Sequence, residues 1–527
     1  MNLVDFASTP LSLVPALVAL GLAIITRKVL LSLGLGIIIG AFLLANYSSS
    51  TAFSYILKSV SAVFIEDGGI NSWNMSIVAF LLLLGSITAL LSLSGGTHAF
   101  ANWAMTKVES KRGSKLLAAF LGVFIFVDDY FNSLAVGTVS RPVTDRYKVS
   151  RAKLAYILDS TAAPTCVLVP ISSWGAYIMT IVAGILTAHG INEYSPLGAY
   201  IALVPINLYA VFALLMVFAV CYFNINLGPM KRHEQLALDN KDPAIIPLTE
   251  NEQQLELSAN KHGKVSDLFV PIITLIVATV ASMIFTGATS LSSNDKPFSI
   301  IGAFENTDVG MSLVYGGLIG LAVTLITVFK QKHKTADIGK TMWIGAKSMF
   351  TAILILIFAW TIGTVIGDMK TGTYLSSLAK GNIAPQLFPV ILFLLAGFMA
   401  FATGTSWGTF GIMLPIAGDI SAATDITMML PMLGAVLAGA VFGDHCSPIS
   451  DTTILSSTGA RCNHIEHVAT QLPYALSIAT ISAIGFIVMG YTQSVNMAFL
   501  MSSICFIALV GFLKNFTKSH DLIVVNP

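Results

Sequence analysis

The chain has 527 residues, of which 55% are hydrophobic and only 10% are charged. Soluble domains carry about 25% charged residues, so this composition excludes a large soluble protein and leaves a polytopic membrane protein whose main partner is the lipid bilayer. The formal net charge is +1, and basic residues gather only in segments expected to flank the membrane, which argues against a nucleic-acid partner. The five cysteines show no CxxC spacing, so neither a disulfide framework nor a zinc site is expected.

Long apolar runs alternate with short polar segments along the chain. Each run is long enough to cross the hydrocarbon core, which takes about 20 helical residues. Two further regions, 116–187 and 384–460, are equally apolar but carry Gly, Pro, Asp, Ser and Thr where a simple span would carry Leu and Val. The simple runs lie at about 10–26, 29–46, 73–94, 196–223, 268–289, 310–329, 348–368, 472–490 and 496–513.

The two interrupted regions are each interpreted as a re-entrant hairpin followed by a broken helix. The hairpins are predicted at about 116–140 and 384–420, and the broken helices at about 154–187 and 429–460. If the N-terminus lies outside and each hairpin enters and leaves on one side, 24 of the 28 Lys and Arg residues fall in cytoplasmic segments. The positive-inside rule favours this orientation, which also puts the C-terminus in the cytoplasm.

The order of spans, hairpin and broken helix is the same in both halves, which start on opposite sides of the membrane. The motif that begins at Asp159 also resembles the one that begins at Asp444. We therefore predict an all-α polytopic membrane protein with two inverted repeats, re-entrant hairpins and broken transmembrane helices, an architecture typical of secondary transporters. Its predicted parts are a first repeat (1–223), a solvated cytoplasmic connector (224–267), a second repeat (268–490) and an extra C-terminal helix with a tail (491–527).

The first hairpin carries two adjacent carboxylates, Asp128 and Asp129, followed by Asn132 and Ser133. An ionised Asp is costly in hydrocarbon, so such a residue is expected to face a site lined by protein or water. Hard oxygen ligands suit small cations such as Na⁺. The alternative is that both aspartates cap a helix at the membrane surface. The two side chains point in different directions on a helix, and the sequence does not tell which one faces the site.

The first broken helix carries Asp159 and Thr161 shortly before Pro164. A proline inside a helix frees carbonyl groups near it, so an acid just before the break indicates a second part of a cation site. The alternative is a proline kink in which Asp159 bonds to a neighbouring helix.

The second hairpin has no charge at its expected tip but is rich in hydroxyl groups. Thr405 and Ser406 offer neutral oxygens, and Gly404 and Gly408 permit a tight turn and a close approach of backbones. The alternative is a motif of small residues that packs helices together.

The second broken helix carries Asp444, Ser447 and Asp451 around Pro448, another set of oxygen ligands beside a proline break. His445 is a candidate proton carrier because histidine titrates near neutral pH; alternatively it bonds a carbonyl group. The remaining histidines are expected in loops or interfacial stretches with structural roles, namely His98, His189, His464 and His467.

Two long stretches resemble the NhaC-type sodium/proton antiporter family of bacterial secondary transporters: VDDYFNSLAVGTVSRPVTDRYKVSRAKLAYILDSTAAPT and GDHCSPISDTTILSSTGARCNHIEHVATQLPYAL. The resemblance implies a scaffold domain, a moving transport domain, a location in the bacterial inner membrane, and allows a homodimer. The resemblance also implies which residues of this chain occupy the polar positions of the family. These are Asp129, Asn132, Ser133, Asp159, Thr161, Thr405, Ser406, Asp444, Ser447 and Asp451.

The first functional hypothesis is Na⁺/H⁺ antiport, with Na⁺ held at Asp129, Asp159 and Asp444 in one state and protons in the other. The second is Na⁺-coupled symport of a small organic solute such as an amino acid, in which the hairpin tips and helix N-termini hold the substrate carboxylate. No GxSxG or Walker A motif is present, so we expect neither an enzyme nor an ATP-driven pump. No cofactor is expected beyond Na⁺ and H⁺ as transported or coupling ions.

Overall fold

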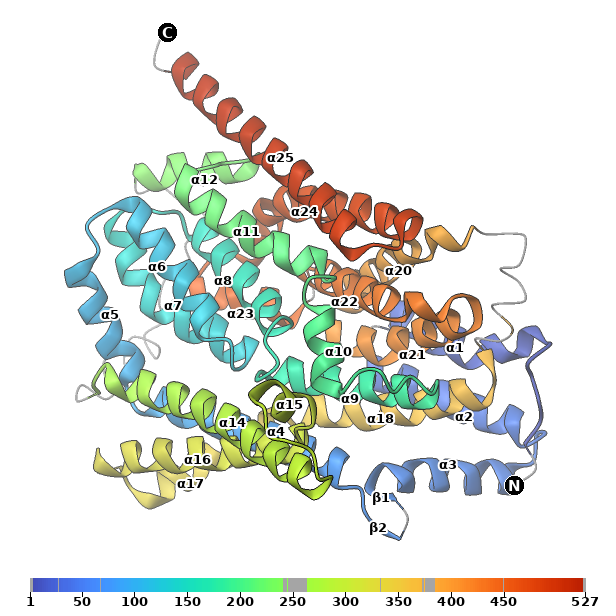
Figure 1. The fold of residues 1–527 in the computed structure, drawn as a ribbon. Helices are drawn as coiled ribbons and strands as arrows, with labels where there is room; N and C mark the ends of the chain where they lie inside the picture. The colour runs from blue at the N-terminus through green and yellow to red at the C-terminus, as the bar shows by residue number, and fades with distance from the viewer. Residues whose placement is uncertain are drawn as a thin grey trace.

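The structure, a computed structural model, describes residues 3–26, 28–66, 68–239, 244, 263–331, 333–371, 374, 384–448 and 450–524. Helices and one short antiparallel β-hairpin make up the first half, up to the polar connector (Figure 1). In chain order these elements are η1 Pro10–Leu13, α1 Val14–Thr26, α2 Val29–Leu44, α3 Ser49–Phe64, β1 Ile65–Glu66, β2 Gly69–Ile70, α4 Ser72–Leu93, α5 Gly96–Lys107, α6 Lys111–Phe124, α7 Asp129–Arg146, α8 Arg151–Cys166, α9 Ser173–Ala188, α10 Pro196–Leu203 and α11 Leu208–Phe223.

The connector contributes helix α12, Pro229–Leu238, and the second half is again helical. Its elements are α14 Ser266–Ser293, α15 Ile300–Glu305, α16 Val309–Lys330, α17 Thr335–Ser348, α18 Phe350–Asp368, η2 Pro385–Leu387, α20 Phe388–Thr403, α21 Ser406–Thr424, η3 Ile426–Met428, α22 Met429–Cys446, α23 Asp451–Ala460, α24 His464–Thr492 and α25 Val495–Val524.

Seven helices in the described ranges are long and apolar enough to cross a membrane, so the chain is an all-α polytopic membrane protein. The predicted span 196–223 is a bent pair of helices, α10 and α11, which meet at an angle of 53°. Pro205 lies at this bend, where it has no N–H to donate to the helical ladder. The Asn207 side chain instead begins α11 by accepting the Ala210 N–H.

Each of the four predicted hairpin and broken-helix segments contains one interruption of its helix. The interruptions lie between α6 and α7, α8 and α9, α20 and α21, and α22 and α23. Ser172 and Ser450 begin α9 and α23 as N-caps, and Gly404 ends α20 in the left-handed region at φ 70°, which only glycine adopts without strain. The inverted relation of the two halves and the boundaries of the parts stay predictions.

Helices from both halves pack into two neighbouring groups (Figure 1). Along one side of the molecule, α14 packs on α16, α16 packs on α4, and α4 packs on α17. The interrupted helices form the second group, in which α23 of the second half packs against α7 and α8 of the first, and α22 packs against α20 and α21. The last helix, α25, lies along the edge of this group, and its membrane-spanning window is only 11% buried, as expected of a helix that faces lipid.

In the described part of the connector, α12 docks on α8 and α24 with His233 and Glu234 buried, whereas most of 240–262 lies outside the described residues. The Glu234 carboxylate accepts the Ser150 N–H at 2.9 Å and the Ser150 hydroxyl at 2.8 Å, and it pairs with Lys111 at 2.8 Å. Burial opposes its ionisation, but the charges of Lys153 and Lys111 and these hydrogen bonds outweigh burial and hold the pKa of Glu234 below its usual value. The amphipathic helix Pro229–Leu238 therefore lies outside the membrane spans and binds the N-terminus of α8.

Candidate functional site

The helix interruptions meet at one buried place, the central site, formed by the N-terminal ends of α7, α9, α21 and α23. Ser173 at the start of α9 contacts Asp128 just before α7, with 3.2 Å between the hydroxyl and a carboxylate oxygen. Ser406 at the start of α21 contacts Asp444 at the end of α22, at 2.8 Å. Helix N-termini carry partial positive charge, so these contacts place acids where backbone dipoles favour them.

The two adjacent carboxylates of the first hairpin have different surroundings. Asp128 and Asp129 are both buried, with exposed fractions of 4% and 2%. Asp128 accepts the Ser173 hydroxyl, whereas the Oδ2 atom of Asp129 makes no hydrogen bond of normal geometry, although the Trp174 indole N–H lies near this carboxylate. The carboxylates of Asp128 and Asp444 are near enough to Asp129 to interact with it electrostatically. Neither aspartate therefore caps a helix at an exposed surface, and Asp129 is the one whose oxygen is left open in the interior.

Two further oxygens without donors accompany Asp129. Asn132, one turn along α7, donates its amide N–H groups to Gly122 and Ile125 carbonyls at 2.6 and 2.9 Å, which satisfies the end of α6, but its own Oδ1 atom has no partner. The Thr165 hydroxyl on α8 also has none. Since α7 and α8 run antiparallel and the Asn132 amide reaches the Thr161 carbonyl at 3.3 Å, Thr165, one turn past Thr161, lies level with Asp129.

Ser133 and Thr161 are buried beside these residues, but their hydroxyl groups form hydrogen bonds with other groups. The Ser133 hydroxyl lies 3.1 Å from that of Ser456 on α23. Thr161 donates to the Ile157 carbonyl of its own helix at 2.8 Å. Both side chains thus join helices or support a helix rather than present free oxygens.

The predicted residues of the second half gather around Asp444, which is 3% exposed. Its carboxylate accepts hydroxyls from Ser406 at 2.8 Å and Ser450 at 2.6 Å, and Ser447 donates to the Phe401 carbonyl at 2.7 Å. Thr405 is half-buried directly before α21. Asp451 begins α23, but its side chain lies outside the described part of the structure.

Asp159 is fully buried, and its carboxylate accepts hydrogen bonds from two helices of the second half. The donors on α24 are His467 at 3.2 Å and Gln471 at 2.6 Å. Those on α23 are Thr453 at 3.1 Å and Ser456 at 3.3 Å. This geometry matches the alternative of an acid bonded to neighbouring helices, and it leaves Na⁺ binding at Asp159 an untested prediction.

Two histidines are buried near the central site. His445 bridges the Ser160 hydroxyl at 2.9 Å and the Tyr209 hydroxyl at 2.6 Å, so the alternative that its ring bonds a carbonyl is wrong. His467 is fully buried against Asp159, although it was expected in a loop or interfacial stretch. Its position beside Glu466, ahead of the predicted span 472–490, offered no signal, because only the packing of α24 on α8 brings the pair together.

Comparison with known proteins identifies the family. A family model described as "Na+/H+ antiporter family" matches residues 165–491. The chain belongs to the Na⁺/H⁺ antiporter family. The matched segment contains the second hairpin and Asp444, whereas Asp128 to Thr161 precede it. As a family member, the chain is a membrane transporter.

Relatives extend this family assignment. An uncharacterised protein of Haemophilus influenzae is 53% identical over 98% of this chain and 97% of its own length. A malate-2H⁺/Na⁺-lactate antiporter of Bacillus subtilis is 33% identical over 32% of this chain, and the Na⁺/H⁺ antiporter NhaC of Alkalihalophilus pseudofirmus is 30% identical over 29% of it; the matches span 36% and 32% of those proteins. The YdaH transporter of Alcanivorax borkumensis shares the fold, with a TM-score of 0.54 and 11% identity over 88% of this chain and 97% of its own.

Proposed function

We propose that this family member is a Na⁺/H⁺ antiporter in which the two cations compete for the carboxylate of Asp129. The observation that carries the proposal is the buried Oδ2 atom of Asp129, which makes no hydrogen bond of normal geometry even though the Trp174 indole N–H lies near the carboxylate. An ionised carboxylate without compensation is very costly in the interior, so either a bound cation or a proton must offset it. Because one site cannot hold both at once, binding of one cation requires release of the other.

The neighbours of Asp129 suit Na⁺ in particular. The open Oδ1 atom of Asn132 and the hydroxyl of Thr165 are neutral oxygens at the same level of the site, and neither has a donor. Hard oxygen ligands with a single carboxylate suit a small monovalent cation. Asp444 stands close enough to attract the cation electrostatically, while its own oxygens hold the start of α21 and the Ser450 N-cap.

The test is Na⁺-driven proton movement in proteoliposomes that contain the purified protein and a pH-sensitive dye. An outward Na⁺ gradient should acidify the lumen, without any organic solute present. Asp129→Asn should abolish the signal, because an amide can neither bind a proton nor carry the charge that holds Na⁺. The matched control is Asp295→Asn, which changes an exposed carboxylate outside the central site and should leave exchange intact. Full exchange by Asp129→Asn would refute the proposal.

A second candidate is cation-coupled transport of a small organic solute. The N-termini of α9 and α21 both point at the central site, a geometry that favours a substrate carboxylate. Relatives named for malate, lactate, arginine and ornithine match about a third of the chain. This candidate predicts no proton movement with Na⁺ alone, and uptake of a labelled amino acid or carboxylate when an inward Na⁺ gradient is imposed.

A further inference from the structure

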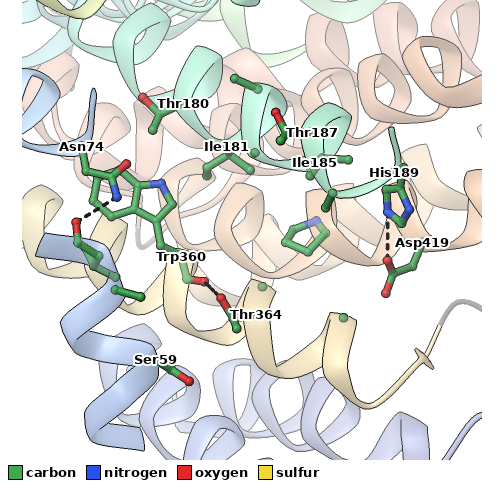
Figure 2. A pocket seen from close by; sticks show the side chains of 18 of the residues that line it. Ser59, Asn74, Thr180, Ile181, Ile185, Thr187, His189, Trp360, Thr364 and Asp419 are labelled. Atoms are coloured by element: carbon green, nitrogen blue, oxygen red, sulfur yellow. Dashed lines mark hydrogen bonds and ion pairs between the residues drawn. The ribbon is translucent and has the colours of Figure 1, made fainter. Parts of the chain in front are cut away.

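A large cavity lies apart from the central site, at the far ends of α9 and α21 (Figure 2). Its volume is about 990 Å³. Side chains of α9 and α21, among them Ile185, His189 and Asp419, form one wall, and α3 and α18, with Ser59 and Trp360, form the facing wall. The cavity opens on the face that the distribution of Lys and Arg predicts to be extracytoplasmic.

Residues along α9 and α21 lie at three levels: the central site, an intermediate layer, and this cavity. Ser173 and Ser406, at the two helix starts, contact the acids of the central site. Thr180 on α9 and Pro415 on α21, about two turns further along, line the inner end of the cavity. The turn between them is occupied by large aromatic side chains from both helices.

These aromatic side chains pack directly on one another. The Trp174 ring lies 6.0 Å from that of Trp407 and 5.7 Å from that of Phe410, both edge to face. The Tyr177 ring lies 4.5 Å from that of Trp407, and its hydroxyl donates to the Trp407 carbonyl at 2.8 Å. Trp174, Tyr177 and Phe410 are almost fully buried and Trp407 is half-buried, so the four rings form one packed aromatic layer between the cavity and the central site.

Several charged side chains line the walls of the cavity. His189 on α9 pairs with Asp419 on α21 at 3.1 Å, which joins the two helices at the mouth just as Tyr177 joins them at the aromatic layer. On the facing wall, Asp368 accepts the Tyr55 hydroxyl at 2.5 Å. With Glu66, three carboxylates line the cavity, against one lysine and one histidine, and such an excess of acid in a cleft raises the local concentration of cations.

We propose that this cavity is the outer vestibule through which cations reach the central site, and that Trp174, Tyr177, Trp407 and Phe410 form the seal that closes it. The proposal rests on the proposed cation transport, because it assigns the route to the same site. Since α9 and α21 are joined both at the seal and at the mouth, they form one wall as a unit. Passage then requires this wall to move relative to α3 and α18, or the aromatic rings to separate.

The experiment measures access and needs no transport. A membrane-impermeant maleimide is added to intact cells, and mass spectrometry of the peptides reports each cysteine separately. Gly184 lines the vestibule, and a side chain added there meets no atom within 4 Å, so Gly184→Cys supplies an outer reporter. The native Cys166, fully buried with its thiol 3.2 Å from the Phe126 carbonyl and near Asp129, is the reporter below the seal.

We expect Gly184→Cys to be labelled from outside while Cys166 stays unlabelled. Trp407→Ala should make Cys166 reactive from outside, and Phe410→Ala is the second opening variant should the first not fold as a monodisperse protein. The matched control is Trp343→Ala, which removes a tryptophan that is 71% exposed on α17. The proposal is overturned if Gly184→Cys is protected in intact cells, or if Cys166 stays protected in both opening variants. Asp129→Asn should keep the wild-type labelling pattern, so failure of the cation site and failure of the vestibule are separable.

Discussion

At the scale of single residues, the buried acids of the central site divide by their partners. Asp159 accepts hydrogen bonds from four side chains, and Asp444 accepts two hydroxyls. Asp129 leaves one oxygen without a donor. A carboxylate with many donors stabilises the packing of the helices that supply them, whereas one with an open oxygen suits a ligand.

This division predicts opposite effects on stability. Asp159→Ala removes the acceptor of four buried donors and leaves the Thr453 hydroxyl and the His467 ring without one, and removal of one partner from a buried ionic network costs about 3–5 kcal/mol. Asp129→Ala removes a carboxylate whose Oδ2 atom makes no hydrogen bond, so it breaks few contacts and should not lower the thermal unfolding temperature in detergent. Equal destabilisation by the two variants would contradict the distinction between a structural acid and a binding acid.

Glu234 gives a prediction for pH, because its pKa is lowered in the folded protein from the ordinary value of 4.5. Its ionised form therefore stabilises the fold at pH values above 4.5, and this contribution is lost as the pH falls through the lower folded value. Glu234→Gln should lower the unfolding temperature at neutral pH, and the gap to wild type should shrink as the pH falls below 4.5. The exposed Glu109→Gln is the control and should follow wild type throughout. A constant gap would mean that the charge of Glu234 contributes nothing.

At the scale of elements, the contact between α7 and α23 depends on two glycines. A Cβ atom at Gly137 would lie 2.6 Å from backbone atoms of Gly459, far inside van der Waals contact. Small residues permit such close packing of membrane helices.

Gly137→Ala should therefore push α23 away from α7 and destabilise the protein by about 1–3 kcal/mol, the usual cost of overpacking. Gly339→Ala on α17, where an added Cβ meets nothing within 4 Å, should be neutral or slightly stabilising because alanine favours helix. Thermal unfolding of the two variants side by side measures the difference. Similar unfolding temperatures would show that α23 can shift without loss.

The elements were more predictable from the sequence than their contacts. Apolar runs predicted the spans, and Gly, Pro, Asp, Ser and Thr within two of them predicted the interrupted segments, because helix formation and helix breaking are local properties. Pro164 was expected at a break but lies inside α8, which continues to Cys166. Asp128 and Asp129 were both predicted to be site residues, but their spacings of four and three from Asn132 did not tell which one has the open oxygen. The partners of Asp159 were not predictable, since His467 and Gln471 follow it by 308 and 312 residues and only tertiary packing joins them. Pro205 was a local signal for the bend between α10 and α11 that the continuous hydropathy of 196–223 outweighed.

At the scale of the whole molecule, the cavity and most basic side chains lie toward opposite ends of the helices. The positive-inside rule then puts the cavity outside. We expect a cysteine at Asn294, after α14, to react with an impermeant maleimide in intact cells, and one at Lys334, after α16, to react only in inverted vesicles. Both residues are exposed. The reverse pattern would invert the orientation of the chain.

The reach of the Asp159 contacts has a consequence for biosynthesis. The carboxylate leaves the ribosome in the first third of the chain, but the first of its four hydrogen-bond donors, Thr453, is made 294 residues later. Until then the Asp159 carboxylate on the nascent α8 lacks the donors that bind it in the folded protein. This early segment therefore has to stay near the translocation machinery, with the carboxylate protonated or in contact with water. Final compaction of this transporter is therefore a late step that begins only once its last third has been inserted.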